Sequence, residues 1–122
     1  MTEPQLDALF AEAWGTGSAR GYERVLKRSL CYFVAFYGDE LVGFVNAGWD
    51  GGAHAFILDT IVRGSARRRG IGLELVRRAI DAAREAGVEW IHVDYEPHLD
   101  EFYGKAGLRP TKARLLHLKT KT

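Results

Sequence analysis

The sequence predicts a single α/β domain with a mixed, largely antiparallel sheet, one β-α-β crossover and helices on both faces of the sheet. Four apolar runs have the length of strands and occur in the order 31–37, 41–47, 54–62 and 88–93. The first two runs are joined by Gly38-Asp39, which favours a tight hairpin turn. The last two are separated by a long amphipathic pattern after Gly72, and a helix in that place is the usual link between parallel neighbouring strands.

Composition limits the chain to one globular domain over residues 1–122. With 122 residues and 47% hydrophobic content, it can bury roughly two-thirds of its unfolded surface. Its 17 basic and 16 acidic residues give a formal charge of +1, so it lacks the basic field that attracts nucleic acid. No apolar run reaches the roughly 18 residues that span a bilayer, and the single cysteine, Cys31, lies in an apolar run. These features predict a cytoplasmic protein, bound to no membrane, with Cys31 in its core.

Two helices are expected before the hairpin. Residues Gln5–Trp14 carry apolar side chains at helical spacing, and residues 22–30 repeat the pattern more weakly. The first helix leaves no room for a strand before it, so Cys31–Tyr37 is expected to form an edge of the sheet. That run has no charged residue and no proline, which are the usual protections of an exposed strand. We therefore expect a homodimer that covers this edge with an interface above roughly 1,000 Å².

The amphipathic pattern after Gly72 predicts the longest helix of the chain. Its polar positions are Glu74, Arg77, Arg78, Asp81 and Glu85, and its apolar positions are Leu75, Val76, Ala79, Ile80, Ala83 and Ala86. Gly87 is well placed to end this helix in the left-handed conformation. A strand over 88–93, a short helix over 100–106 and a last strand over 115–118 are expected to follow.

The segment Arg67-Arg68-Arg69-Gly70-Ile71-Gly72 connects the third strand to this helix, and its composition predicts a phosphate site. Its two glycines let backbone N–H groups approach an anion without interference from a Cβ atom. The unpaired N–H groups of the first helical turn point to the same place, and the arginines add charge-assisted hydrogen bonds. A merely solvated arginine loop is the alternative, and the glycines and flanking elements argue against it.

Together these features resemble the GNAT superfamily of acyl-CoA-dependent N-acetyltransferases. The resemblance covers residues 56–110 and rests on Arg67-x-x-Gly70-x-Gly72 between a strand and a helix, followed by Glu101-Phe102-Tyr103-Gly104-Lys105-Ala106-Gly107-Leu108. It implies a GNAT-like sheet that lacks its usual first edge strand. It also implies an enzyme that moves an acetyl group from acetyl-CoA to a primary amine by direct attack in a ternary complex. A non-catalytic acyl-CoA-binding or protein-interaction module with the same fold is the alternative.

The resemblance further implies which residues contact the cofactor. The CoA pyrophosphate is expected at Arg67, Arg68, Arg69, Gly70, Ile71 and Gly72, and the pantetheine along the backbone of Thr60, Ile61 and Val62. Tyr103 is implied as the general acid, and a phenol with an ordinary pKa of about 10 is well matched to a departing thiolate. The alternative for Tyr103 is a core aromatic residue whose hydroxyl is bound to the backbone.

The candidate base is Asp59, a carboxylate inside an apolar strand. An unpaired charge in that place would cost several kcal/mol, so Asp59 should face either a partner or the cleft. A structural ion pair is the alternative reading. Asp94 and Glu96, at the end of the fourth strand, are competing carboxylates and candidate substrate-binding residues. Glu96 stands where the family often has an asparagine that contacts the cofactor.

The remaining polar residues leave the acceptor open. Four histidines, His54, His92, His98 and His117, are scattered without the spacing of metal ligands, so no metal is expected. The acidic candidates would suit a cationic amine, either a small molecule or a peptide.

Overall fold

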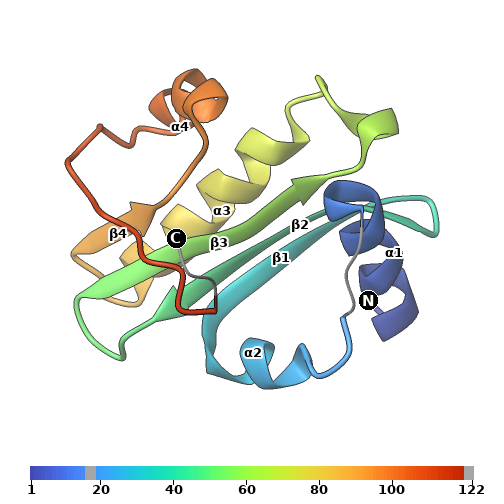
Figure 1. Ribbon diagram of the computed structural model, residues 1–122, viewed down its shortest axis with the longest axis horizontal. Helices are drawn as coiled ribbons and strands as arrows, with labels where there is room; N and C mark the ends of the chain where they lie inside the picture. The colour runs from blue at the N-terminus through green and yellow to red at the C-terminus, as the bar shows by residue number, and fades with distance from the viewer. Residues whose placement is uncertain (16–18, 120–122) are drawn as a thin grey trace.

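The structure, a computed structural model, describes residues 1–15 and 19–119 and contains a four-stranded mixed sheet in the order β1-β2-β3-β4 (Figure 1). Its strands are β1 (Ser29–Tyr37), β2 (Glu40–Trp49), β3 (His54–Val62) and β4 (Trp90–Val93). Its helices are α1 (Glu3–Trp14), α2 (Glu23–Arg28), α3 (Ile71–Glu85) and α4 (Asp100–Lys105), with 3-10 turns η1 (Gly64–Ala66) and η2 (Pro97–Leu99). The β1-β2 and β2-β3 pairs are antiparallel, and β3 and β4 are parallel and joined through α3. The predicted fold class is confirmed.

The helices cover both faces of the sheet, as predicted. Successive residues of β2 point to opposite faces, so Phe44 packs with Leu9 and Phe10 of α1 while Val45 packs with Val76 of α3. Figure 1 shows α3 and α4, in yellow and orange, on one side of the sheet and α1 and α2, in blue, on the other. Of the predicted apolar stripe of α3, Leu75, Val76, Ala79 and Ala83 are buried, Ile80 is partly buried, and Ala86, past the end of the helix, is exposed.

Several boundaries differ from the sequence predictions. The second helix is shorter because Ser29 already pairs with Gly48 as the first residue of β1. The fourth strand starts late, since Val88 donates its N–H to the Ala83 carbonyl and so closes the turn after α3. Cys31 is only partly buried beside the α3 cluster and is not a fully enclosed core residue.

The predicted last strand over 115–118 is wrong. Residues 108–117 form no helix or strand, and Leu115, Leu116 and Leu118 are 85%, 71% and 86% exposed. A strand needs a neighbour for its backbone groups. Instead, a groove of about 740 Å³ separates the segment 107–115 from β4. Within the described ranges, 1–15 and 19–119, no helix is both long and apolar enough to cross a membrane.

Candidate functional site

The Arg67–Gly72 segment ends at a helix N terminus that no side chain caps. Gly70 is the N-cap residue and has a left-handed backbone, φ 77°, which glycine adopts without steric cost. Helix α3 begins at Ile71, so Ile71 and Gly72 belong to its first turn and not to the loop before it. The first-turn N–H groups of Ile71, Gly72 and Leu73 have no acceptor among the described residues. This end of α3 is therefore open to an anion.

The three arginines of the segment are exposed, and none forms an ion pair with a described residue. Arg67 Nε donates to the Val62 carbonyl oxygen at 3.2 Å, so this side chain folds back onto the end of β3. Arg63, four residues before it, shows the contrasting case, because its Nη1 lies 2.8 Å from Glu12 Oε2. The positive charge next to the α3 N terminus is thus not neutralised by the described part of the chain.

Gly72 marks the point where α3, β3 and α4 meet. A Cβ atom at this glycine would lie 3.3 Å from both the Phe102 ring and Val62 Cγ2, which is tighter than ordinary packing allows. A side chain at this position would require the Phe102 and Val62 side chains to shift by a few tenths of an ångström, so glycine suits the close approach of α3 to both neighbours. The contact brings Phe102, and with it the helix that carries Tyr103, next to the Arg67–Gly72 segment.

Tyr103 has a buried ring and a free hydroxyl. Its side chain is 5% exposed and packs against Tyr95 and Phe102, with ring centroids 5.1 Å and 4.9 Å away. The hydroxyl makes no hydrogen bond to a described residue, yet it is not among their buried unpartnered atoms, so it reaches solvent. The ring lies in the core, as the alternative reading of Tyr103 held, but the backbone partner that this reading assigned to the hydroxyl is not present among the described residues.

Strands β3 and β4 separate halfway along β3. Their pairing ends at Ile57 and Val93, and the remaining residues of β3 pair only with β2. In this half, Ile61 is buried against α1 and Val62 ends the strand. The Thr60 hydroxyl is the one buried side-chain polar atom in residues 1–15 and 19–119 that has no hydrogen-bond partner. No described residue supplies the partner that a buried hydroxyl normally has.

Asp59 lies in a β-bulge at the start of this half. Phe44 pairs with Ile61 and Asn46 with Leu58, so two residues of β3, Asp59 and Thr60, lie opposite one residue of β2. Asp59 adopts the left-handed conformation with φ 54°, which is uncommon for any residue except glycine. It forms no ion pair with a described residue, contrary to the structural alternative, and its partner is the neutral Tyr22 hydroxyl.

A chain of three residues that the sequence did not connect with Asp59 leads to its carboxylate, although Tyr22 could be noted as one of several aromatic residues suited to a cationic amine. The Tyr22 hydroxyl donates to Asp59 Oδ2 at 2.6 Å, Asn46 Nδ2 lies 3.5 Å from the Tyr22 oxygen, and Ser29 Oγ donates to Asn46 Oδ1. Burial, and then the hydrogen bond with Asp59, raise the pKa of Tyr22 above that of an ordinary phenol. We call Ser29, Asn46, Tyr22 and Asp59 the polar chain. Of Ser29 and Asn46, only Asn46 could have been noticed in the sequence, since an amide inside an apolar strand needs partners.

The other candidate carboxylates lie elsewhere. Asp94 and Glu96 are exposed after the end of β4, and Asp94 lines the groove between β4 and the segment 107–115, which no member of the polar chain lines. The structure therefore does not join them to Asp59. Within the described residues, no group of three or more His, Cys, Asp or Glu side chains is arranged to hold a metal ion.

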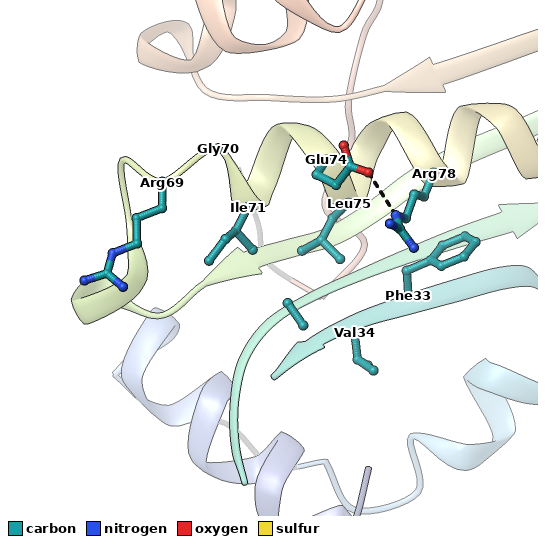
Figure 2. Close-up of a pocket in the computed structure, with 9 residues that line it drawn as sticks. Phe33, Val34, Arg69, Gly70, Ile71, Glu74, Leu75 and Arg78 are labelled. Atoms are coloured by element: carbon teal, nitrogen blue, oxygen red, sulfur yellow. Dashed lines mark hydrogen bonds and ion pairs between the residues drawn. The ribbon is translucent and has the colours of Figure 1, made fainter. Parts of the chain in front are cut away.

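A second groove, of about 400 Å³, lies between the edge strand β1 and α3 (Figure 2). In Figure 2, Ile71 and Leu75 point from α3 towards the sheet, Arg78 lies near Phe33 of β1, and Arg69 points away at the start of the helix. The groove lies beside β1, whereas the separation of β3 from β4 is two strands further along the sheet. Its apolar floor is an extension of the exposed sheet edge.

Comparison with known proteins agrees with this geometry. The model of the Acetyltransferase (GNAT) family matches residues 4–108. A curated protein of Oryza sativa subsp. japonica, named "Probable glucosamine 6-phosphate N-acetyltransferase 2", is 40% identical over 57 residues. That stretch is 47% of this chain and 34% of the rice protein, so the chain matches only about a third of the relative's length.

Solved structures resemble nearly the whole chain. Glucosamine-6-phosphate N-acetyltransferase from Arabidopsis thaliana superposes with a TM-score of 0.79 at 14% identity, covering 98% of this chain and 95% of that one. The structure of AAC(6')-Iy in complex with the bisubstrate analog CoA-S-monomethyl-acetylneamine gives 0.77 at 18% identity, covering 96% and 90%. At these identities the structural likeness establishes the fold alone. The family match, which covers most of the chain, shows that the chain belongs to the GNAT family of acetyltransferases.

Proposed function

We propose that this protein is an N-acetyltransferase that transfers an acetyl group from acetyl-CoA to a primary amine in a ternary complex. The observation that carries the proposal is the convergence at Gly72, where an uncapped helix N terminus, unpaired arginines and the helix of Tyr103 come together. The adjacent half of β3 leaves backbone groups without a β4 partner. An elongated thioester with phosphate groups could therefore place its phosphates at the helix N terminus and its chain along the edge of β3.

The residues present fit acetyl-CoA without a metal. The N–H groups of the first turn of α3 and the Arg67, Arg68 and Arg69 side chains would hold the pyrophosphate. The backbone of Thr60, Ile61 and Val62, together with the orphan Thr60 hydroxyl, would bind the amide groups of the pantetheine. Gly70 and Gly72 are required by backbone conformation and by close approach, so they would act through the shape of the segment.

Acetyl-CoA supplies an acetyl group activated as a thioester, and the side chains supply the proton transfers. Asp59 would accept a proton from the substrate ammonium, which leaves a neutral amine able to attack. A free backbone N–H of β3 would donate to the oxyanion of the tetrahedral intermediate, a contact typically contributing roughly 3 kcal/mol. As the C–N bond forms and the C–S bond breaks, Tyr103 would give its hydroxyl proton to the departing sulfur. The nitrogen still carries one proton more than an amide and would release it through water to the Tyr103 phenolate, and Asp59 would return its proton to solvent, so both side chains are restored.

A turnover assay with a panel of amines tests this function. The names of the relatives point to amino sugars and aminoglycosides, so the panel begins with glucosamine 6-phosphate and neamine and continues with polyamines and peptide N termini. Release of free CoA thiol that depends on one class of amine is the expected result. Binding of acetyl-CoA without thiol release from any amine would instead favour the binding module.

We also propose a homodimer that covers β1. This strand is an edge of the sheet, carries no charged residue and leaves Tyr32 and Phe36 45% and 44% exposed. Its unpaired N–H and C=O groups and the apolar groove beside α3 together form an open template for another chain. Antiparallel pairing of β1 with β1 of a second copy, related by a two-fold axis, would pair these backbone groups and cover the apolar groove in one interface.

Light scattering across micromolar concentrations tests the dimer. The wild-type protein is expected at twice the 13.6 kDa chain mass, and Phe36→Lys, which places a charge on the edge, is expected to shift the population to monomer. Thr111→Lys adds the same charge to an exposed position outside the sheet and should leave the dimer intact. A monodisperse wild-type monomer would contradict the proposal.

A further inference from the structure

We propose that Tyr22 is a positioning residue that fixes the carboxylate of Asp59 for proton transfer, held in its own place by Asn46 and Ser29. The inference rests on the proposed function and adds to it a residue that belongs neither to the Arg67–Gly72 segment nor to the helix of Tyr103. The Tyr22 hydroxyl contacts neither the Arg67–Gly72 segment nor Tyr103, and its hydrogen-bond partners are Asp59 and Asn46. Its effect on turnover therefore has to pass through Asp59.

The polar chain has one direction. Ser29 Oγ carries one proton and has two acceptors within reach, Asn46 Oδ1 and the Val25 carbonyl oxygen, the latter at 3.0 Å. Asn46 Nδ2 donates at the long distance of 3.5 Å to the Tyr22 oxygen, and the Tyr22 hydroxyl donates to Asp59 Oδ2 at 2.6 Å. Each donor thus faces the next acceptor, and the last acceptor is a carboxylate. Donors that follow one another in this way polarise each other, which strengthens the final bond to the charged group. Because Asn46 is 1% exposed, water cannot replace its place in the chain.

Asp59 needs such a partner because its backbone does not fix its side chain. The bulge gives it φ 54° and removes it from the regular alternation that directs the other side chains of β3. Tyr22, by contrast, is fixed from three sides. It is the N-cap residue of α2, and its ring packs edge-on against Phe10 and Phe44 with centroids 5.1 Å and 5.9 Å away. The Tyr22 hydroxyl is therefore a fixed point from which the carboxylate can be oriented.

The contact leaves one carboxylate oxygen free. Asp59 Oδ1 makes no hydrogen bond to a described residue and is not a buried unpartnered atom, so it reaches solvent. In the proposed step, one proton moves from the substrate ammonium to Oδ1, and the nitrogen keeps the electron pair that attacks the thioester. Oδ2 remains bound to Tyr22 throughout.

Tyr22→Phe tests the inference, with Tyr32→Phe as the matched control. Tyr32 also packs its ring against Phe44, with centroids 6.3 Å apart, but its hydroxyl has no hydrogen bond to a described residue. With the amine found in the panel assay, Tyr22→Phe is expected to lower kcat at least about fivefold with unchanged affinity for acetyl-CoA. Its KM for the amine should stay within about twofold of wild type, because the substitution changes the orientation of the base and removes no contact with either substrate. Tyr32→Phe should match the wild type.

Two results would overturn the positioning role while leaving the function intact. One is a Tyr22→Phe enzyme with wild-type kcat. The other is a Tyr22→Phe enzyme whose kcat falls only together with its stability, its affinity for acetyl-CoA or its KM for the amine, which is what a purely structural residue gives. A wild-type protein that turns over no amine would remove the proposed function instead, and the two failures are therefore distinguishable.

A spectroscopic measurement on the free protein tests whether the Tyr22 hydroxyl is hydrogen-bonded to Asp59 in solution. Ultraviolet titration of wild type against Tyr22→Phe isolates the ionisation of the Tyr22 phenol. Replacing Asp59 with Asn removes the negative acceptor, so in that background the Tyr22 phenol should ionise at lower pH. An unchanged titration would mean that Tyr22 and Asp59 are not hydrogen-bonded in solution and would overturn the inference without any assay of turnover.

Discussion

The two sides of the candidate site satisfy their polar groups in opposite ways. On the proposed cofactor side, formed by the Arg67–Gly72 segment, Thr60 and Tyr103, the helix N–H groups, the Thr60 hydroxyl and the Tyr103 hydroxyl have no partner among the described residues. On the proposed acceptor side, formed by the polar chain, each polar group is bonded to the next. The groups of the proposed cofactor side would therefore be completed by a ligand, whereas those of the proposed acceptor side are already bonded to one another in the free protein.

This difference predicts which property of the protein a substitution should change. Changes that only remove a polar group on the proposed cofactor side take away contacts that exist only in the complex, so they should alter affinity or rate and leave the stability of the free protein nearly unchanged. Changes in the polar chain break bonds that exist in the free protein, so they should lower the free energy of unfolding as well. The predictions below test the contrast from its largest expected effect to its smallest.

The largest effect is expected from Arg67→Ala combined with Gly70→Val. The first change removes a charged donor, and the second forces a β-branched residue into a backbone with φ 77°. A lost charge-assisted hydrogen bond contributes about 1.5–3 kcal/mol, so calorimetry should show acetyl-CoA affinity reduced on the order of 10- to 100-fold. Arg77→Ala, on the exposed polar face of α3, is the charge control and should bind normally. Equal affinity in the double variant would mean that the segment is not a phosphate site.

Tyr103→Phe is expected to separate rate from binding. The ring and its packing on Tyr95 and Phe102 are kept, and only the unpartnered hydroxyl is removed. Acetyl-CoA affinity should be unchanged while kcat falls at least about tenfold, the low end of general-acid contributions. Tyr95→Phe removes a neighbouring hydroxyl that is bound to Asp100, and its kcat should stay within about twofold of wild type. An undiminished rate in Tyr103→Phe would leave Tyr103 a core residue.

The same contrast explains what the sequence could predict. The Arg67–Gly72 segment is contiguous, and its chemistry depends on backbone groups and glycines that any reader of the chain can place. Helix α3 could be predicted equally well, because its apolar stripe alone determines which face packs on the sheet. The polar chain, in contrast, joins Tyr22, Ser29, Asn46 and Asp59 from four separate elements, and only tertiary packing brings them within hydrogen-bonding distance.

Two further features could not be predicted from the sequence, because they also depend on tertiary contacts. The bulge at Asp59 depends on register with β2, which no local pattern in β3 encodes. The segment Leu115–Leu118 has apolar residues of the right kind, but a strand forms only where a neighbour supplies backbone partners, and here none is in place. Local sequence predicts what a segment does by itself, and these features depend on what lies next to it.

A pair of serine substitutions tests whether the two sides differ in stability. Ser29→Ala leaves the buried Asn46 oxygen without its donor and should lower the free energy of unfolding by about 1–2 kcal/mol. Ser65→Ala, in the turn just before the arginines, removes an exposed hydroxyl and should change it by less than about 0.5 kcal/mol. Urea denaturation measures both values. Equal losses would mean that the polar chain contributes no more to stability than a surface hydroxyl does.

The smallest effect, and the sharpest contrast, is expected at Thr60. Thr60→Val keeps the branched shape that suits a strand and removes a buried hydroxyl that has no partner in the free protein. Burying such a group costs free energy, so the variant should be as stable as wild type or more stable by up to about 1 kcal/mol. If the hydroxyl is completed by the pantetheine, the same variant should bind acetyl-CoA a few-fold more weakly, on the order of one neutral hydrogen bond. Urea denaturation and calorimetry on one preparation measure the two quantities. If Thr60→Val lowers stability but leaves acetyl-CoA affinity unchanged, the Thr60 hydroxyl contributes to the folded protein and not to cofactor binding. That result would contradict the proposed contrast between the two sides at this residue.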